Sequence, residues 1–461
     1  MKSKTEIFES MPIPRALMDF ALPMIISQLV TLAYNLADTY YLGRTGNPYM
    51  VAAVSLILPV FNITIAIANL FGTGGGSLIS RLLGSGNESE ARKVCVYSIY
   101  VSIFASVLFA LACFVFMKPL LLLLGASSQT YAYAKQYANI IIVLGGVPTV
   151  LELVMANIVR STGYARQSGF GMSLGGILNI FLDPLFMFVL LPKGNEVIGA
   201  AIATMISNVA AMTYFIITIR KLKKTTVLTM NVHAGLPSAA SIKSLYSVGI
   251  PASLSTFLYD LTNIVIDMLA SSFGDIPLAA IGIVLKAERL PLNIGIGICQ
   301  GMIPLIAYNY SAGNFKRMRG FLNFSRLAGL CTSLLCIILY EVFAADIMKL
   351  FIDNQETVLL GTGFIRIRCL ATFFMFMCFN FVFFFQAIGF GTISFLLAVI
   401  RQLVFNIPIL FLFRHIFGVY GIVWTQLTGD ACTGLVSFII YFYIEQKVIH
   451  PKENSLNTIK K

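Results

Sequence analysis

Three observations predict an all-α integral membrane protein, with twelve transmembrane helices in two parallel six-helix repeats, or lobes, around a central cavity. First, 58% of the 461 residues are hydrophobic and only 11% are charged, whereas about a quarter of the residues of soluble domains are charged. Second, apolar segments long enough to cross a bilayer recur along the whole chain. Third, the two halves of the chain resemble each other. The composition argues against a soluble enzyme, a secreted disulfide scaffold and a disordered protein.

The twelve predicted spans follow from the length of the apolar segments, because a helix needs about 20 apolar residues to cross a bilayer core. They are residues 15–41, 49–80, 94–117, 131–156, 169–191, 197–219, 245–270, 277–309, 321–343, 360–388, 393–413 and 419–443. Segments of this length exclude the strands of a membrane barrel, which are about ten residues long and alternate in polarity.

The basic residues predict the orientation of the spans. Most of the 32 Lys and Arg residues lie in segments that would face the cytoplasm, including five in the connection 220–244, and only five lie in the outer loops. Cytoplasmic loops carry this excess of positive charge. We therefore expect a multi-pass protein of the inner (plasma) membrane with both termini in the cytoplasm. Because the basic residues form no groove-lining stripe, we expect no nucleic-acid partner.

An internal repeat runs through nearly the whole sequence. Gly86-Asn87 matches Gly313-Asn314 at an offset of 227 residues, and Gly199 matches Gly421 at an offset of 222. The repeat predicts an N-terminal lobe at residues 1–230 and a C-terminal lobe, with a short cytoplasmic tail, at 231–461. Each half contains six spans, an even number, so both halves enter the membrane with the same polarity. Parallel repeats of this kind are typical of secondary transporters.

Carboxyl groups inside the predicted spans are the first functional candidates, because an ionised carboxylate in hydrocarbon is costly. They are Asp38, Glu152, Asp183, Asp260, Asp267, Glu288 and Asp430.

Four oxygen-bearing side chains are expected at similar depth in the outer half of the first lobe. Asp38 and Asp183 lie there by their position along their spans, and Asn179 lies one helical turn from Asp183 on the same face. With Thr204 they would bind a hard cation such as Na⁺, and the carboxyl pair would also suit a proton. We include Asn35 in this cation-coupling set. Alternatively, Asp38 caps its helix and Asp183 pairs with an arginine or the backbone.

Several stretches resemble the MATE (multidrug and toxic compound extrusion) family. They are LPMIISQLVTLAYNLADTYYLGRTG, SRLLGSGNESEARK, IVRSTGYARQ, NIFLDPLFMF, GAAIATMISN, PLIAYNYSAGN and FQAIGFG, in that order along the chain. The resemblance implies a two-lobed antiporter that exports organic, often cationic, compounds against an inward flow of Na⁺ or H⁺. It also implies that Asp38 is the acid of the first helix and that Asn179 and Asp183 are the NxxxD of the fifth. Thr204 is a looser match.

The second half departs from the pattern of those family members that carry acids in the seventh and tenth helices. The tenth span contains no Asp or Glu, and Asp260 only lies near the position in the seventh. We therefore expect coupling through the first lobe. An internal salt bridge is expected within the cluster Lys286, Glu288 and Arg289, whereas Glu152 could either pair with a basic residue or act in transport. The residues assigned to a substrate cavity are Asp260, Glu288, Met375 and Asn380.

The predicted function is cation-coupled export of small organic cations or drugs by a monomer in the lipid bilayer, with no cofactor beyond H⁺ or Na⁺. The alternative is a flippase for a lipid-linked saccharide, whose pyrophosphate would need basic residues in the cavity. Those available are Lys286, Arg289, Arg366, Arg368 and Arg401. An enzyme is not expected, because the three histidines are isolated. A nucleotide-driven pump is not expected either, because the glycine-rich segment 72–76 lacks the lysine of a phosphate-binding loop. This segment is instead interpreted as serving helix packing or flexibility.

Overall fold

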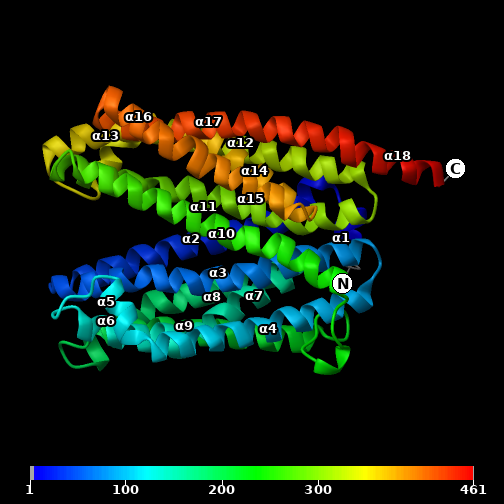
Figure 1. Cartoon of the computed structure of the whole chain (residues 1–461), viewed down its shortest axis with the longest axis horizontal. Coiled ribbons are helices and arrows are strands. Elements are labelled where there is room, and N and C mark those ends of the chain that lie inside the picture. The colour runs from blue at the N-terminus through cyan, green and yellow to red at the C-terminus, as the bar shows by residue number, and fades with distance from the viewer. Residues whose placement is uncertain (1–4, 460–461) are drawn as a thin grey trace. The chain divides into compact units, whose positions relative to one another are not determined.

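The computed structural model describes residues 5–459, with all their side chains except those of residues 5, 260, 457 and 459. These residues form helices and connecting turns, without a strand among them (Figure 1). The first half contains α1 (Thr5–Glu9), α2 (Ile13–Gly43), α3 (Pro48–Gly84), α4 (Glu88–Val115), α5 (Met117–Leu123), α6 (Tyr131–Ala138), η1 (Asn139–Leu144), α7 (Gly146–Ser161), α8 (Ala165–Pro184), η2 (Leu185–Leu190) and α9 (Glu196–Leu222). The second half contains η3 (Val232–Ala234), α10 (Ala239–Ser271), α11 (Asp275–Ser311), α12 (Phe315–Lys349), α13 (Gln355–Cys369), α14 (Ala371–Ala387), α15 (Gly391–Val399), η4 (Ile400–Asn406), α16 (Ile407–Phe417), α17 (Val419–Ile444), η5 (Glu445–Ile449) and α18 (His450–Ile459).

The predicted membrane spans are confirmed. Within the described residues, nine helices are long and apolar enough to cross a bilayer, and two further pairs of helices form bent spans, Tyr131–Leu144 with Gly146–Ser161 (45°) and Gln355–Cys369 with Ala371–Ala387 (43°). Helix α10 covers the remaining predicted span at 245–270. The two bent spans occupy equivalent places in the two halves.

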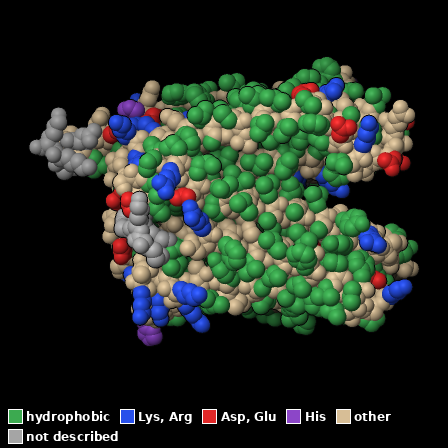
Figure 2. Space-filling view, turned by 180° about the vertical axis from the view of Figure 1, so that it is seen from behind, with side chains coloured by type: hydrophobic (Ala, Val, Ile, Leu, Met, Phe, Trp, Pro, Cys, Tyr) green, Lys and Arg blue, Asp and Glu red, His purple; other side chains and the backbone are tan. Residues whose placement is uncertain are grey.

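The outer surface has the polarity that a bilayer requires. Figure 2 shows hydrophobic side chains over the flanks of the helices and charged side chains gathered toward the two helix ends. Large apolar side chains such as Phe104, Phe181 and Leu359 are more than two-thirds exposed. Water would disfavour an apolar surface of this extent, whereas lipid chains solvate it.

The internal repeat is visible in the backbone as four pairs of glycines with positive φ. The pairs are Gly46 and Gly274, Gly86 and Gly313, Gly163 and Gly389, and Gly194 and Gly418. Each glycine lies in a turn at the end of a long helix or just before one. A residue without a Cβ reaches this conformation at little steric cost. The matching turns therefore show that both halves follow the same path.

The described chain forms two compact units. We call residues 26–253 the N unit, and residues 1–25 with 254–461 the C unit. The long helices α2 and α10 each contribute their first part to one unit and their second part to the other. The predicted lobes, 1–230 and 231–461, differ from these units in the two exchanged segments.

Small residues explain why the first parts of α2 and α10 pack as they do. In the N unit, a Cβ on Gly74 of α3 would lie 3.0 Å from the Cα of Gly249 on α10. In the C unit, a Cβ on Gly301 of α11 would lie 2.7 Å from the Cα of Ala21 on α2. Gly74 and Gly301 are repeat equivalents, and so are Gly249 and Ala21. Small residues allow helix backbones to approach closely in membranes, and here both copies of the repeat use the same contact.

The glycine-rich segment 72–76 packs helices, as one of the two sequence interpretations predicts. It lies inside α3, and its four glycines are buried. A Cβ on Gly72 would lie 3.0 Å from the Asn157 amide nitrogen of α7, and a Cβ on Gly75 would meet Ser98 of α4. Together with Gly74, these glycines let α4, α7 and α10 approach α3 on three sides.

Substitution of Gly249 by alanine is expected to destabilise the protein by about 1–3 kcal/mol, because the new methyl group would overlap the backbone of Leu70. The measurement is the midpoint of thermal unfolding of purified protein in detergent. Gly434→Ala in α17 is the matched control, since a Cβ there meets nothing within 4 Å. An equal effect of the two substitutions would contradict close packing at Gly249.

Candidate cation-binding site

Three of the predicted cation-coupling side chains meet inside the N unit. Asn179 and Asp183 lie one turn apart on α8, and the Asn179 Nδ2 donates to Asp183 Oδ1 at 3.2 Å. The same nitrogen donates to Thr204 Oγ1 of α9 at 3.1 Å. Asp183 is fully buried, and its second oxygen Oδ2 has no hydrogen-bond partner among the described atoms. Among the same atoms, the buried Asn179 Oδ1 also lacks a partner.

This arrangement can bind a small cation. Carboxylate, amide and hydroxyl oxygens are the ligands that a hard cation takes in proteins. A buried acceptor without a donor is costly, and a bound metal ion or a proton would relieve the cost at Asp183.

Asp38 lies beside this cluster on α2. Helix α2 approaches α8 at Gly176, where a Cβ would lie 3.2 Å from Tyr34 Cδ1. The carboxyls of Asp38 and Asp183 are close enough for their charges to interact. Asp38 is half-buried, and no hydrogen bond or ion pair within the described residues occupies its carboxyl. Asn35 is exposed, and no hydrogen bond within the described residues joins its side chain to the buried cluster.

Two buried carboxyls of the C unit, Asp430 and Glu288, are paired with arginines instead. Asp430 accepts from Arg401 Nε at 2.6 Å and from its Nη2 at 2.9 Å, and it also accepts from Gln426 Nε2 at 2.6 Å. Glu288 accepts from Arg368 Nε at 2.7 Å, and Arg368 also donates to Gln426. All four charged groups are buried. The C unit therefore contains a buried network in which charges of opposite sign compensate each other.

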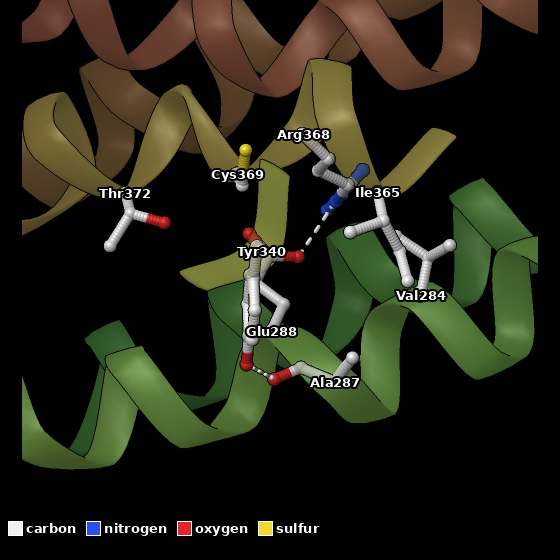
Figure 3. A pocket seen from close by; sticks show the side chains of 8 residues that line it. All are labelled: Val284, Ala287, Glu288, Tyr340, Ile365, Arg368, Cys369 and Thr372. Carbon is white, nitrogen blue, oxygen red and sulfur yellow. Dashed lines mark hydrogen bonds and ion pairs between the residues drawn. The ribbon is translucent and has the colours of Figure 1, made fainter. Parts of the chain in front are cut away.

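The salt bridge expected for Glu288 exists, but the expected partner was wrong. Figure 3 shows Glu288 reaching across a small pocket to Arg368 of α13, which lies 80 residues later in the chain. Lys286 and Arg289 are two residues and one residue away on the same helix, and such positions do not face each other. The Tyr340 hydroxyl donates to the Ala287 carbonyl oxygen at 2.5 Å on the other side of this pocket.

The other residues assigned to a substrate cavity lie inside the C unit. Asn380 is fully buried, donates to Ser325 Oγ at 3.0 Å and accepts from Arg326 Nε at 3.2 Å. Met375 is also buried. The side chain of Asp260 lies outside the described residues. The role of Asp260, Glu288, Met375 and Asn380 in binding a substrate stays a prediction.

Sequence reasoning missed Arg401 as the partner of Asp430. The available signal was Arg401, the single charged residue of the predicted span 393–413. It also missed the Asn208 Nδ2, which donates to Thr149 Oγ1 at 2.7 Å in the N unit. Asn208 is the repeat equivalent of Asp430, so this place in each half carries a polar contact between helices.

A comparison with protein families identifies the family. The family model described as MatE matches residues 23–185 and again 251–412. The chain belongs to the MatE family. The two matched segments begin 228 residues apart, close to the offset of 227 residues between Gly86 and Gly313 in the internal repeat. The first of them contains Asp38, Asn179 and Asp183.

Relatives of the MatE family align with almost the whole chain. "Multidrug export protein MepA" of Staphylococcus aureus (strain MSSA476) is 30% identical over 441 residues, 96% of each protein. The protein of the same name from Staphylococcus haemolyticus (strain JCSC1435) is 32% identical over 435 residues, 94% of each.

Solved structures of the MatE family share the fold. A MATE crystal structure in complex with MaL6 has a TM-score of 0.91 at 24% identity and covers 98% of this chain and 100% of its own. A multidrug resistance MATE family transporter in the outward-facing conformation also has a TM-score of 0.91 at 24% identity, covering 98% and 99%. The twelve-helix, two-lobed arrangement predicted from the sequence fits this fold.

Proposed function

We propose that the protein is a secondary antiporter that exports small organic, often cationic, compounds in exchange for inward H⁺ or Na⁺. The observation that carries the proposal is the Asn179–Asp183–Thr204 cluster, with two buried oxygens that have no partner among the described atoms and with Asp38 beside it. The names of the relatives, which are multidrug export proteins, support drug-like substrates. The proposal involves no catalytic step and no cofactor besides the coupling ion.

The chemistry of the cluster suits exchange between an inward-moving ion and an outward-moving substrate. A carboxyl in a low-dielectric site changes its energy strongly when a proton or Na⁺ binds, because the charge has no water to screen it. Two units with the same fold could use that change in energy to alternate access to the two membrane faces. A ligand can shift such an equilibrium only through different affinities for the two states, and a buried carboxyl pair provides such a difference.

The membrane setting forms part of the proposal. We propose a monomer in the cell membrane with both termini cytoplasmic, because the connections assigned to the inside carry most of the Lys and Arg residues.

The alternative of a flippase for a lipid-linked saccharide receives less support. It relied on five basic residues to hold a pyrophosphate. Arg368 and Arg401 are each bonded to a buried carboxylate at 2.7 and 2.6 Å, so their charges are already compensated.

Dye efflux from proteoliposomes tests the antiporter under separately imposed Na⁺ and H⁺ gradients. Wild-type protein should drive efflux of a cationic dye with one of these gradients, and Asp38→Asn should reduce that rate about 10- to 100-fold, as expected when a charged ligand is lost. Asp353→Asn, in the exposed connection between α12 and α13, is the matched control and should leave efflux unchanged.

Each outcome of the efflux test has a distinct meaning. Efflux that persists in Asp38→Asn removes Asp38 from the coupling mechanism. Absence of gradient-driven efflux from wild type for every cationic dye would contradict the antiporter and favour the lipid-linked substrate.

A further inference from the structure

We call Asn179, Asp183 and Thr204 the outer cluster. A line of polar side chains leads from this cluster to Glu152 within the N unit. Thr204, which accepts from Asn179, is followed one turn later on α9 by Asn208. The Asn208 Nδ2 donates to Thr149 Oγ1 of α7 at 2.7 Å. Three residues after Thr149, on the same face of α7, is Glu152. The line therefore begins at one buried carboxyl, Asp183, and ends at another.

Glu152 is a buried carboxyl without a counter-charge. The residue is only 8% exposed, and the described residues provide it with no ion pair and no hydrogen bond. The arginine two turns along α7, Arg160, donates instead to the Asn157 side chain. Of the two interpretations left open by the sequence, the structure does not support the first, because Glu152 does not pair with a basic residue of the described chain. A role of Glu152 in transport stays a prediction.

The depth of Glu152 differs from that of the outer cluster. Its Oε1 lies 3.3 Å from the position that a Cβ on Gly175 of α8 would occupy. Gly175 precedes Asp183 by eight residues, which corresponds to about 12 Å along a helix axis. Tyr34 of α2 lies within electrostatic range of Glu152 and also of the two outer carboxyls. The three carboxyls thus share one polar interior at two levels.

We propose that Glu152 is a second, inner binding station for the coupling cation, linked to the outer cluster by the polar line through Thr204, Asn208 and Thr149. A buried carboxylate without a partner must take up a proton or another cation to be stable in this environment. The hydroxyls and amides of the line offer a cation oxygen contacts between the two levels. The assignment of the cation as the coupling ion rests on the proposed antiport.

Infrared difference spectroscopy of the purified protein in lipid tests this assignment without transport. One arm changes the pH in sodium-free buffer, and the other adds NaCl at constant pH, so the arms distinguish H⁺ from Na⁺. In one of the two arms, the carboxyl bands of wild type should include a component that disappears in Glu152→Gln. Glu341→Gln is the matched control, because Glu341 is half-exposed and lies opposite Arg366; its spectrum should match wild type.

Two further variants separate the inner station from a folding effect. Glu152→Asp keeps the carboxyl and should retain the band at a shifted position. Thr149→Val keeps Glu152 but breaks the line, so gradient-driven efflux should fall about tenfold while dye binding at equilibrium stays within about twofold of wild type.

The outcomes distinguish the inner station from the antiport mechanism. Identical spectra for wild type and Glu152→Gln in both arms would overturn the inner station. If Glu152→Gln does not fold, a Glu152→Asp spectrum with no shifted carboxyl component would overturn it equally. A lost band in a protein that shows no gradient-driven efflux would leave the cation site established and contradict only the antiport.

Discussion

Asp183→Asn should abolish cation-driven efflux, with a loss of about 100-fold or more, which corresponds to about 3 kcal/mol or more for a buried cation left without its carboxylate. Asp183 is fully buried, and its Oδ2 is free of protein donors among the described atoms. The substituted amide keeps an oxygen that can accept from Asn179, so the fold should persist. The measurement is the initial rate of dye efflux under the driving gradient, with unfolding temperature and elution profile recorded in parallel.

The neighbouring residues give this prediction a graded control. Thr204→Val removes one oxygen from the cluster but no charge, so it should weaken the apparent affinity for the driving ion by about tenfold and leave the maximal rate closer to wild type. Asp346→Asn, an exposed carboxyl near the end of α12, should have no effect. Efflux by Asp183→Asn at the rate of Asp346→Asn would exclude Asp183 as a coupling residue.

Arg401→Met should destabilise the protein by about 3–5 kcal/mol, because it leaves Asp430 as an unpaired charge in the interior of the C unit. The double variant Arg401→Met with Asp430→Leu removes both charges and should regain most of that loss. The measurement is unfolding in detergent, followed by temperature or denaturant. Both variants lose the same arginine, so the difference in their stability measures the cost of leaving the Asp430 charge unpaired.

The exposed ion pair of the same unit is the matched control for this prediction. Arg366 Nε lies 3.7 Å from Glu341 Oε2, and the two side chains are 54% and 42% exposed. Solvent screens such a pair, so Arg366→Met should cost less than about 1 kcal/mol. Equal losses for Arg366→Met and Arg401→Met would contradict a structural role for the buried pair.

The buried pairs of the C unit support coupling through the N unit. Asp430 and Glu288 are each bonded to an arginine, so a cation would have to displace a guanidinium to bind there. Asp183 and Glu152 have no such competitor in the described chain. Among the described residues, Asp430 and Glu288 are therefore compensated by arginines, whereas Asp183 and Glu152 are not.

Most of the fold could be predicted from the sequence, because a lipid environment restricts what a chain can do. Backbone groups in hydrocarbon must be bonded within their own segment, so each apolar run of sufficient length becomes a helix. The predicted span 419–443 became Val419–Ile444, and 49–80 became Pro48–Gly84. Short helices such as α5 and α18 were missed, because they need not cross the bilayer and lack that constraint.

The sequence by itself determined which side chains share a face of one helix. The four-residue spacing of Asn179 and Asp183 placed them together before any tertiary contact was known. Only the tertiary structure decided which helix each face meets. It set Arg368 rather than Lys286 beside Glu288, joined Asn208 to Thr149, and left Glu152 without a basic partner among the described residues. Helical periodicity is local and can be counted along a chain, whereas contacts between helices depend on packing among residues that can lie 80 positions apart, as Glu288 and Arg368 do.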